Sequence, residues 1–216
     1  VTVGGYYASG HLGSEVFPAG DQDGDGLVDY LVSTDAGDVA VILPGGVEDP
    51  VVPDDAIFRL TRSEAGAGDR EDVRMIGDVD GDGRGDLAAI HQSETVRFFT
   101  ALSANPVALA ENPTSEVDYG DGSYAYASLG LGDLDGDGRD ETLLAAQWDP
   151  SLSTSLAAVW SGDLVHVGAH DDVHDAGLTA GSTRTASGFG YRAALSADID
   201  GDGGADIVLG GYADAE

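Results

Sequence analysis

The chain lacks cysteine and lysine altogether, so disulfide bridges play no part in its fold. All 9 basic residues are arginine, and they face 40 acidic residues, which gives a formal net charge of −31 at pH 7. A surface this acidic repels phosphate backbones and anionic lipid headgroups. We therefore expect no nucleic-acid partner.

Long apolar runs are also missing. No segment approaches the roughly 20 apolar residues that a membrane-spanning helix needs, so no membrane insertion is expected. The sequence contains no Gly-x-Ser-x-Gly elbow and no paired nucleophile and base, which disfavours an enzyme. It has no signal peptide and does not begin with methionine. This fits a mature or truncated product.

What the chain has in abundance is one acidic loop of nine residues, repeated four times. The loop reads DQDGDGLVD at 21–29, DVDGDGRGD at 78–86, DLDGDGRDE at 133–141 and DIDGDGGAD at 198–206. Carboxylates at alternate positions, separated by glycines that allow tight turns, are what a hard cation needs. Ca²⁺ takes about six to eight oxygen ligands. The sequence therefore predicts four Ca²⁺ sites.

Within each loop we expect side-chain ligands at positions 1, 3, 5 and 9 and a backbone carbonyl ligand at position 7. In the third loop Glu141 stands where the others have Asp, and Asp140 precedes it. Either Glu141 binds the ion through both oxygens or Asp140 competes for it. The predicted ligands are Asp21, Asp23, Asp25, Leu27, Asp29, Asp78, Asp80, Asp82, Arg84, Asp86, Asp133, Asp135, Asp137, Arg139, Glu141, Asp198, Asp200, Asp202, Gly204 and Asp206.

The EF-hand is the competing motif, but it needs a glutamate at position 12 and a helix after the loop. Apolar residues stand at position 12 in all four copies: Val32, Ala89, Leu144 and Leu209. The runs that follow the loops are short, apolar and bounded by turn residues, which indicates strands. Each loop is therefore predicted to be the tip of a β-hairpin.

Successive loops begin at Asp21, Asp78, Asp133 and Asp198. A period this long, with several short strands per unit, is typical of propeller blades or a β array. We predict an all-β fold of four-stranded blades. The expected strands are 15–19, 29–33, 38–43 and 56–60, then 73–76, 87–91, 95–99 and 107–110, then 128–131, 142–146, 156–160 and 164–167, and finally 192–197 and 207–211.

The unit resembles the FG-GAP repeat of integrin α-chain β-propellers and their bacterial relatives. The residues that carry the resemblance are the loops, Leu12-Gly13-Ser14-Glu15-Val16 before the first loop, and Phe189-Gly190-Tyr191 and Gly210-Gly211-Tyr212 around the fourth. The second repeat lacks both the FG and the GAP halves. The resemblance implies blades in a ring of seven, with calcium loops on one face and ligand binding usually on the opposite face.

The chain is interpreted as a single propeller segment, 1–216. Its repeats span approximately 11–60, 61–112, 113–167 and 168–216, and residues 1–10 resemble the end of a preceding repeat. We expect an incomplete ring of about four blades, with further blades in the same or a partner chain. A compact four-bladed ring is the alternative.

The expected function is a calcium-binding module for adhesion or protein–protein recognition, with Ca²⁺ rigidifying the blades and a protein or glycan as ligand. The alternatives are an accessory or glycan-binding part of a secreted hydrolase or lyase, and a structural module of a surface fibre. Weak repeated calcium sites fill where free Ca²⁺ is near ~10⁻³ M, so we expect an extracellular or cell-surface protein.

Three further features have two interpretations each. Arg84-Gly85-Asp86 spells the RGD adhesion tripeptide, but it occupies positions 7–9 of a predicted calcium loop, which favours a structural role. His166, His170 and His174 form a transition-metal site if the segment is helical, and otherwise lie in a solvated loop. The aromatic residues of the loop-like segment 119–126 either bind glycans or fill space between blades.

Overall fold

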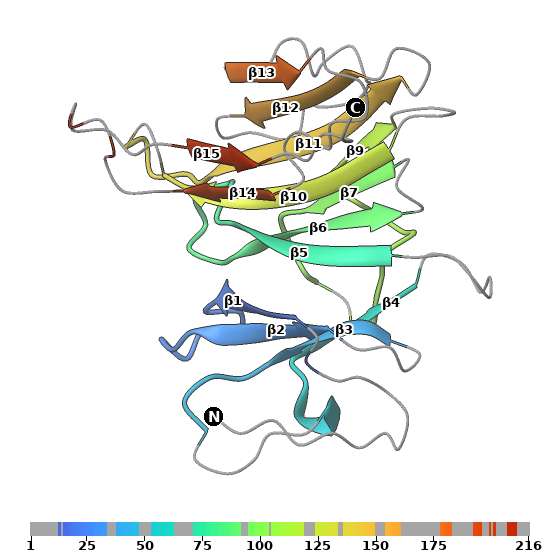
Figure 1. Ribbon diagram of the computed structural model, residues 1–216. Helices are drawn as coiled ribbons and strands as arrows, with labels where there is room; N and C mark the ends of the chain where they lie inside the picture. Colours follow the sequence, from blue (N-terminus) through green and yellow to red (C-terminus); the bar gives the residue numbers. More distant parts are fainter. Residues whose placement is uncertain are drawn as a thin grey trace.

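The computed structural model (Figure 1) describes residues 13, 15–33, 38–47, 53–62, 71–91, 95–103, 105–118, 124–133, 136–149, 154–160, 178–182, 192–195, 199, 201 and 207–210. Within these residues the regular structure is β-strand, apart from the single 3-10 turn η1 (Pro53–Asp55). The predicted all-β class is confirmed.

The strands form four antiparallel sheets in chain order, with β8 as one parallel addition. The first sheet contains β1 (Val16–Gly20), β2 (Asp29–Ser33), β3 (Asp38–Leu43), β4 (Phe58–Thr61) and β8 (Val107–Ala108). The second contains β5 (Glu71–Gly77), β6 (Asp86–His91), β7 (Thr95–Phe99) and β9 (Ser115–Asp118). The third contains β10 (Tyr124–Gly132), β11 (Glu141–Asp149), β12 (Thr154–Trp160) and β13 (Leu178–Ser182), and the fourth β14 (Arg192–Leu195) and β15 (Ile207–Gly210).

Each acidic loop connects the first two strands of a sheet, and those two strands pair antiparallel in all four cases. The hairpin prediction is confirmed. Since a strand follows each loop, the EF-hand alternative is excluded. A strand forms after each loop because the short apolar run there supplies buried residues such as Leu31 and Leu87, both 0 % exposed.

The fourth strand of the second sheet was predicted wrongly. Segment 107–110 was expected there, but β8 pairs in parallel with β4 of the first sheet, and β9 takes the place beside β7. By crossing to the first sheet, the segment places Leu109 in the core between the two sheets, where this side chain is 0 % exposed. Its backbone is held there by a 3.1 Å hydrogen bond from Leu109 N to Thr61 O.

The fourth strand of the third sheet was also placed wrongly. β13 occupies that position and pairs with β12 from Ser155↔Ser182 to Val159↔Leu178. The predicted segment 164–167 lies outside the described residues. The second and third sheets therefore extend beyond the repeat limits expected at residues 112 and 167.

The sheets stack in chain order through their first strands. β5 lies against β1 on one side and β10 on the other, and β10 lies against β14 (Figure 1). The main core cluster lies between the first two sheets and includes Ala19, Leu31, Leu60, Val73 and Leu87. The described strands form an open series of stacked sheets, and no closed ring is found among them.

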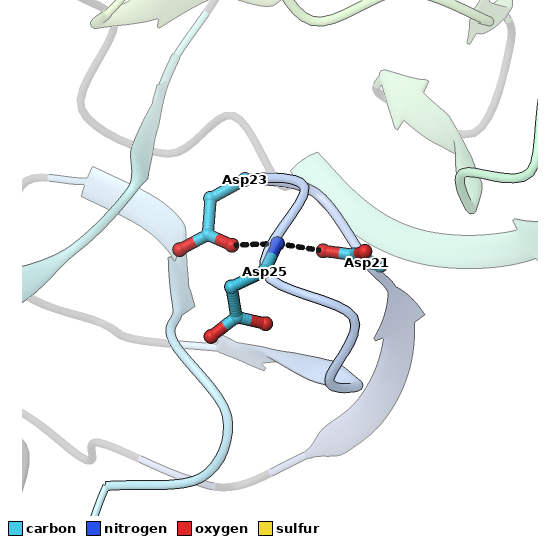
Figure 2. Close-up of side chains that lie close together, drawn as sticks. All are labelled: Asp21, Asp23 and Asp25. Atoms are coloured by element: carbon cyan, nitrogen blue, oxygen red, sulfur yellow. Dashed lines mark hydrogen bonds between the residues drawn. The ribbon is translucent and has the colours of Figure 1, made fainter.

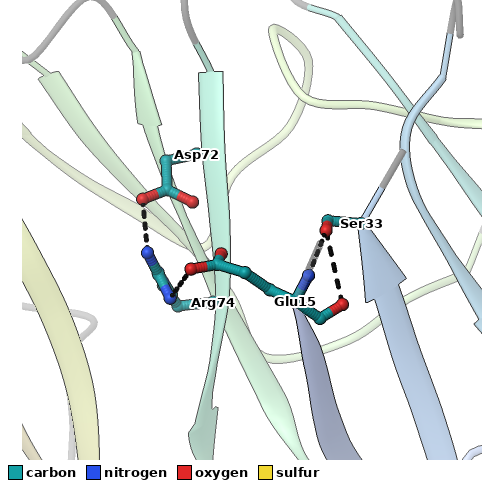
Figure 3. A network of polar contacts seen from close by, with 4 residues as sticks. All are labelled: Glu15, Ser33, Asp72 and Arg74. Atoms are coloured by element: carbon teal, nitrogen blue, oxygen red, sulfur yellow. Dashed lines mark hydrogen bonds and ion pairs between the residues drawn. The ribbon is translucent and has the colours of Figure 1, made fainter. Parts of the chain in front are cut away.

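A charged network also joins the first two sheets (Figure 3). The Arg74 guanidinium on β5 lies 2.8 Å from Oε1 of Glu15, the residue before β1, and 2.8 Å from Asp72 Oδ2. Its carbon also lies 5.2 Å from the centre of the Phe17 ring. Charge-assisted hydrogen bonds and cation–π contact act together here to fix the two sheets relative to each other.

Candidate metal-binding loops

The loops are built around the carboxylate at position 1. In the first loop Asp21 Oδ1 accepts hydrogen bonds from Gly24 N at 2.7 Å and Asp25 N at 3.0 Å, and Oδ2 accepts one from Gly26 N at 2.8 Å. One side chain thus satisfies three backbone amides, because the chain curls around it. These hydrogen bonds fix the conformation of the loop without an ion.

The same hydrogen bonds recur in the other described loops. Asp78 accepts from Gly81, Asp82 and Gly83 in the second loop. In the third loop Asp133 accepts from Gly136 N at 2.7 Å and from Gly138 N at 3.0 Å. The repeated sequence therefore produces a repeated backbone conformation.

Glycine is required at positions 4 and 6 for its backbone conformation. Gly24 and Gly26 both have φ of 84°, and Gly81 and Gly83 have 79° and 88°. A Cβ added at Gly24, Gly26 or Gly83 would meet nothing within 4 Å, so packing is not the reason. The left-handed region favours glycine because other residues are strained there.

Two loops gather three carboxylates each. Oxygens of Asp21, Asp23 and Asp25 lie within 4.8 Å of one another in the first loop (Figure 2). In the second loop the group is Asp78, Asp80 and Asp86, again within 4.8 Å. Positions 1 and 3 are common to both groups, and position 5 or position 9 completes each. Such all-oxygen clusters suit a hard divalent cation.

The residue at position 9 is buried in every described loop: Asp29 is 0 %, Asp86 2 % and Glu141 2 % exposed. Asp29 accepts hydrogen bonds from Gln22 N at 2.7 Å and Gly45 N at 2.8 Å. Asp86 Oδ2 accepts one from Val79 N at 2.7 Å. In the first two loops the carboxylate at position 9 thus accepts a hydrogen bond from the backbone amide of position 2.

Burial raises the pKa of Asp86 to about 8, and the neighbouring charges of Asp80, Asp78 and Asp82 act in the same direction. The hydrogen bond from Val79 N opposes this shift. Burial also raises the pKa of Asp29. A bound cation would favour the charged form of both groups and so act against these shifts.

This predicts that the calcium-free protein loses stability as the pH rises from about 4 to about 8. The unfolded chain releases the Asp86 proton near the ordinary value of 3.8, whereas the folded protein keeps it until about 8. The stabilising contribution is present below the unfolded pKa and is lost as the pH rises through the folded pKa. Urea unfolding in EDTA across this range measures it. A stability that rises with pH, or the same slope in Asp86→Asn, would contradict the prediction.

Adjacent loops are also joined to one another. Gln22 Nε2, at position 2 of the first loop, donates to Gly85 O of the second loop and to Ala19 O, both at 2.6 Å. Between the second and third loops, Asp140 Oδ2 accepts from Asp78 N and Asp140 N donates to Asp78 O, both at 2.8 Å. In both cases position 8 of one loop lies on the start of the preceding loop, so the loops line one edge of the stacked sheets.

Sequence reasoning missed this connection. Asp140 was considered only as a competing ligand within its own loop, and Gln22 was not considered. The available signal was the glycine that precedes the first three loops: Gly20, Gly77 and Gly132. A Cβ on Gly77 would lie 2.1 Å from Asp140 Oδ2, and a Cβ on Gly20 would lie 2.6 Å from Gly85 N.

The RGD tripeptide lies within the second loop. Arg84 is exposed, but Asp86 is only 2 % exposed and accepts the hydrogen bond from Val79 N. The backbone of Gly85 lies against the first sheet, where its N–H donates to Ala19 O at 3.2 Å. The acidic residue that a receptor would need is therefore buried.

Several predicted site residues lie outside the described part of the chain. They are Asp135, Asp198, Asp200, Asp202, Gly204, Asp206, His166, His170 and His174. The expectation that segment 119–126 is a loop is wrong at its end, because Tyr124 and Tyr126 belong to strand β10. Strand β10 starts there because it pairs with β11 as far as Tyr124↔Gln147.

Comparison with protein-family models and with curated proteins found no match for this chain. A search of the described residues for a helix long and apolar enough to cross a membrane found none.

Proposed function

We propose that the chain is a calcium-binding β-repeat module, in which each acidic loop holds one Ca²⁺ and the ions stiffen the edge where the loops line up. The observation that carries this proposal is the recurring set of hydrogen bonds around the carboxylate at position 1, together with the carboxylates gathered beside it. Asp21 and Asp78 hold their loops in the same way, and each belongs to a cluster of three carboxylates. A conformation that gathers like charges is costly unless a cation offsets the repulsion.

The donor set favours calcium over other metals. The clustered ligand atoms are all carboxylate oxygens, which suit Ca²⁺, Mg²⁺ or Mn²⁺ rather than zinc or copper. Mg²⁺ keeps several waters and demands a near-octahedral shell, whereas Ca²⁺ accepts a larger and less regular set of oxygens. The proposed ligand set of four carboxylates and a backbone carbonyl, of which three carboxylates lie together in each of the first two loops, matches Ca²⁺ better.

For the architecture, we propose an open β-propeller of the FG-GAP type. The support is the antiparallel meander in each sheet, with successive first strands packed against one another. Blades of a propeller are sheets of this kind arranged around a central axis. In this arrangement β1, β5, β10 and β14 are the inner strands.

The role that follows is recognition or adhesion outside the cell, where millimolar Ca²⁺ keeps weak sites filled. The ligand would bind on the face away from the loops, because the loop edge is already occupied by ions and loop–loop contacts. No described feature favours the glycan-binding alternative, since Tyr124 and Tyr126 lie in strand β10 rather than in a loop.

The proposal is tested by Asp80→Ala, which removes an exposed carboxylate at position 3 of the second loop. We expect the number of bound Ca²⁺ ions to fall by one, with the remaining sites kept, because stacked repeats are coupled mainly to their neighbours. Calorimetric titration measures the number. Glu111→Ala, which removes an exposed acid outside the loops, is the matched control. An unchanged stoichiometry in Asp80→Ala would refute the site.

A further inference from the structure

The contact between the second and third loops acts on a residue that belongs to a carboxylate cluster. Asp140 Oδ2 accepts a hydrogen bond from Asp78 N, and Asp140 N donates to Asp78 O, both at 2.8 Å. Both backbone polar groups of Asp78 are thus held by one residue of the next loop. The Asp78 carboxylate in turn accepts the amide hydrogen bonds that shape the second loop, from Gly81, Asp82 and Gly83. The position of this carboxylate therefore depends on Asp140.

The third loop also packs along the start of the second loop. A Cβ added at Gly81, position 4 of the second loop, would lie 3.4 Å from Cγ of Arg139 and 3.5 Å from Gly138 O. A Cβ added at Gly77, the residue before the loop, would overlap Asp140 Oδ2. Three consecutive residues of the third loop thus hold the segment that carries Asp78.

The contact between the first and second loops is built differently. Position 8 of the second loop is Gly85, which has no side chain to accept a hydrogen bond. Its N–H donates to Ala19 O, two residues before the first loop begins, and its carbonyl accepts from Gln22 Nε2. A Cβ added at Gly24 would meet nothing within 4 Å. Asp21 therefore has no counterpart of the carboxylate by which Asp140 holds Asp78.

The proposed ligand set places Asp140 between two ligands of the third ion. These are the backbone carbonyl of Arg139 at position 7 and the side chain of Glu141 at position 9. An ion in the third loop would hold the chain on both sides of Asp140 and so keep its hydrogen bonds to Asp78 in place. An ion in the second loop would hold Asp78 for the same contact. When one ligand orders residues that another must order, the second ligand binds more tightly.

We infer that Asp140 is a positioning residue that couples calcium binding in the second and third loops, so that filling either loop raises the affinity of the other. This inference rests on the proposed function, because it takes both loops to be calcium sites. The factor is the same in both directions by thermodynamic linkage, and such couplings are typically about fivefold or more. The two loops should therefore fill together over a narrow range of calcium concentration, and the first loop should fill independently of the third.

The test follows each loop separately in the full chain by nuclear magnetic resonance. The amides of Gly83 and Gly138 report on the second and third loops, since they donate to Asp78 Oδ2 and Asp133 Oδ2. During titration of the unmodified chain with calcium chloride, both signals should change over the same range, along curves steeper than those of independent sites. Circular dichroism verifies that each variant described below is folded.

Two substitutions of Asp140 separate positioning from charge. Asp140→Ala keeps the backbone hydrogen bond to Asp78 O but removes the acceptor for Asp78 N. It should weaken calcium binding in the second loop by about fivefold or more and make the Gly83 and Gly138 curves independent. Asp140→Asn removes the charge but keeps an acceptor, so it should preserve the joint transition. An equal loss in Asp140→Asn would show that Asp140 acts through its charge alone and would overturn the inference.

Removing one ion tests the coupling from the other side. Asp80→Ala, which is designed to empty the second loop, should raise the calcium midpoint of the Gly138 signal by about fivefold or more, while the third loop still fills at saturating calcium. Asp23→Ala makes the same change in the first loop and should leave that midpoint where it is. In a chain that already carries Asp140→Ala, Asp80→Ala should have little further effect on Gly138.

The outcomes distinguish this inference from the proposed function. If calcium moved neither the Gly83 nor the Gly138 signal, the calcium sites would be refuted, and the coupling with them. If both signals responded but independently, or if Asp80→Ala and Asp23→Ala shifted Gly138 equally, calcium binding would stand and the role of Asp140 would be overturned.

Discussion

Chelation of calcium is expected to lower the melting temperature of this protein by tens of degrees. A ligand that binds only the folded state adds about 2.7 kcal/mol per site when its free concentration is 100 times its dissociation constant. For a domain of this size each kcal/mol shifts the melting temperature by roughly 2–4 °C. Each filled loop should thus contribute roughly 5–10 °C, and four loops add up.

The size of the effect follows from the loops themselves. Their carboxylates are held within 4.8 Å of one another by the same hydrogen bonds in the first and second loops. Without a cation these charges repel, and the buried Asp86 keeps a raised pKa of about 8. The calcium-free fold therefore carries an electrostatic cost that a bound cation would offset.

Differential scanning calorimetry in millimolar calcium and in EDTA measures the difference. High concentrations of sodium chloride in EDTA provide the control, since salt screens the repulsion among exposed charges without filling a site. We expect calcium, but not salt, to restore the melting temperature. Superimposable curves in calcium and EDTA would show that the loops do not stabilise the fold through a bound ion.

The local elements were predictable from the sequence because they depend on neighbouring residues. The loop glycines specify left-handed turns, and the apolar runs after the loops specify strands, so β2, β3 and β7 have the predicted limits. Which strand completes a sheet is a non-local property. Segment 107–110 and β9 both suit a sheet edge, and the burial of Val107 and Leu109 between the first two sheets distinguishes the first from the second.

The same division applies to the candidate site. The carboxylates at positions 1 and 3 come together because the loop sequence folds on itself. The roles of Gln22 and Asp140 depend on a second loop about 60 residues away in the chain. The glycines before the loops indicated a close approach, but not which residue would approach them.

The second large effect is expected from substitutions of Asp86, for which an ion-binding role and an adhesive role of the RGD tripeptide predict different results. Asp86→Asn keeps an acceptor for Val79 N but removes the charge. In calcium we expect it to lose the ion of the second loop and the associated roughly 5–10 °C of melting temperature. In EDTA above pH 8 we expect it to be at least as stable as the unmodified chain, because the raised pKa reflects a charge that is costly to bury.

Asp86→Ala separates the hydrogen bond from the charge. It leaves Val79 N buried without its acceptor, which costs about 1–3 kcal/mol in calcium and EDTA alike. Urea unfolding of both variants in both buffers therefore distinguishes a ligand from a purely structural acceptor. Equal losses for Asp86→Asn in calcium and in EDTA would mean that the carboxylate binds no ion.

Arg84→Ala is the matched test of the adhesive interpretation. Arg84 is exposed, and we expect it to offer only its backbone carbonyl to the ion, so the variant should keep the full calcium number and stability. An integrin-type receptor that reads the tripeptide would need both the Arg84 and the Asp86 side chains. Immobilised receptor should therefore bind neither the unmodified chain nor Arg84→Ala through this segment. If receptor bound the unmodified chain and lost it in calcium-loaded Arg84→Ala or Asp86→Glu, the tripeptide would be an adhesive site, because the loop and its ion would still be in place.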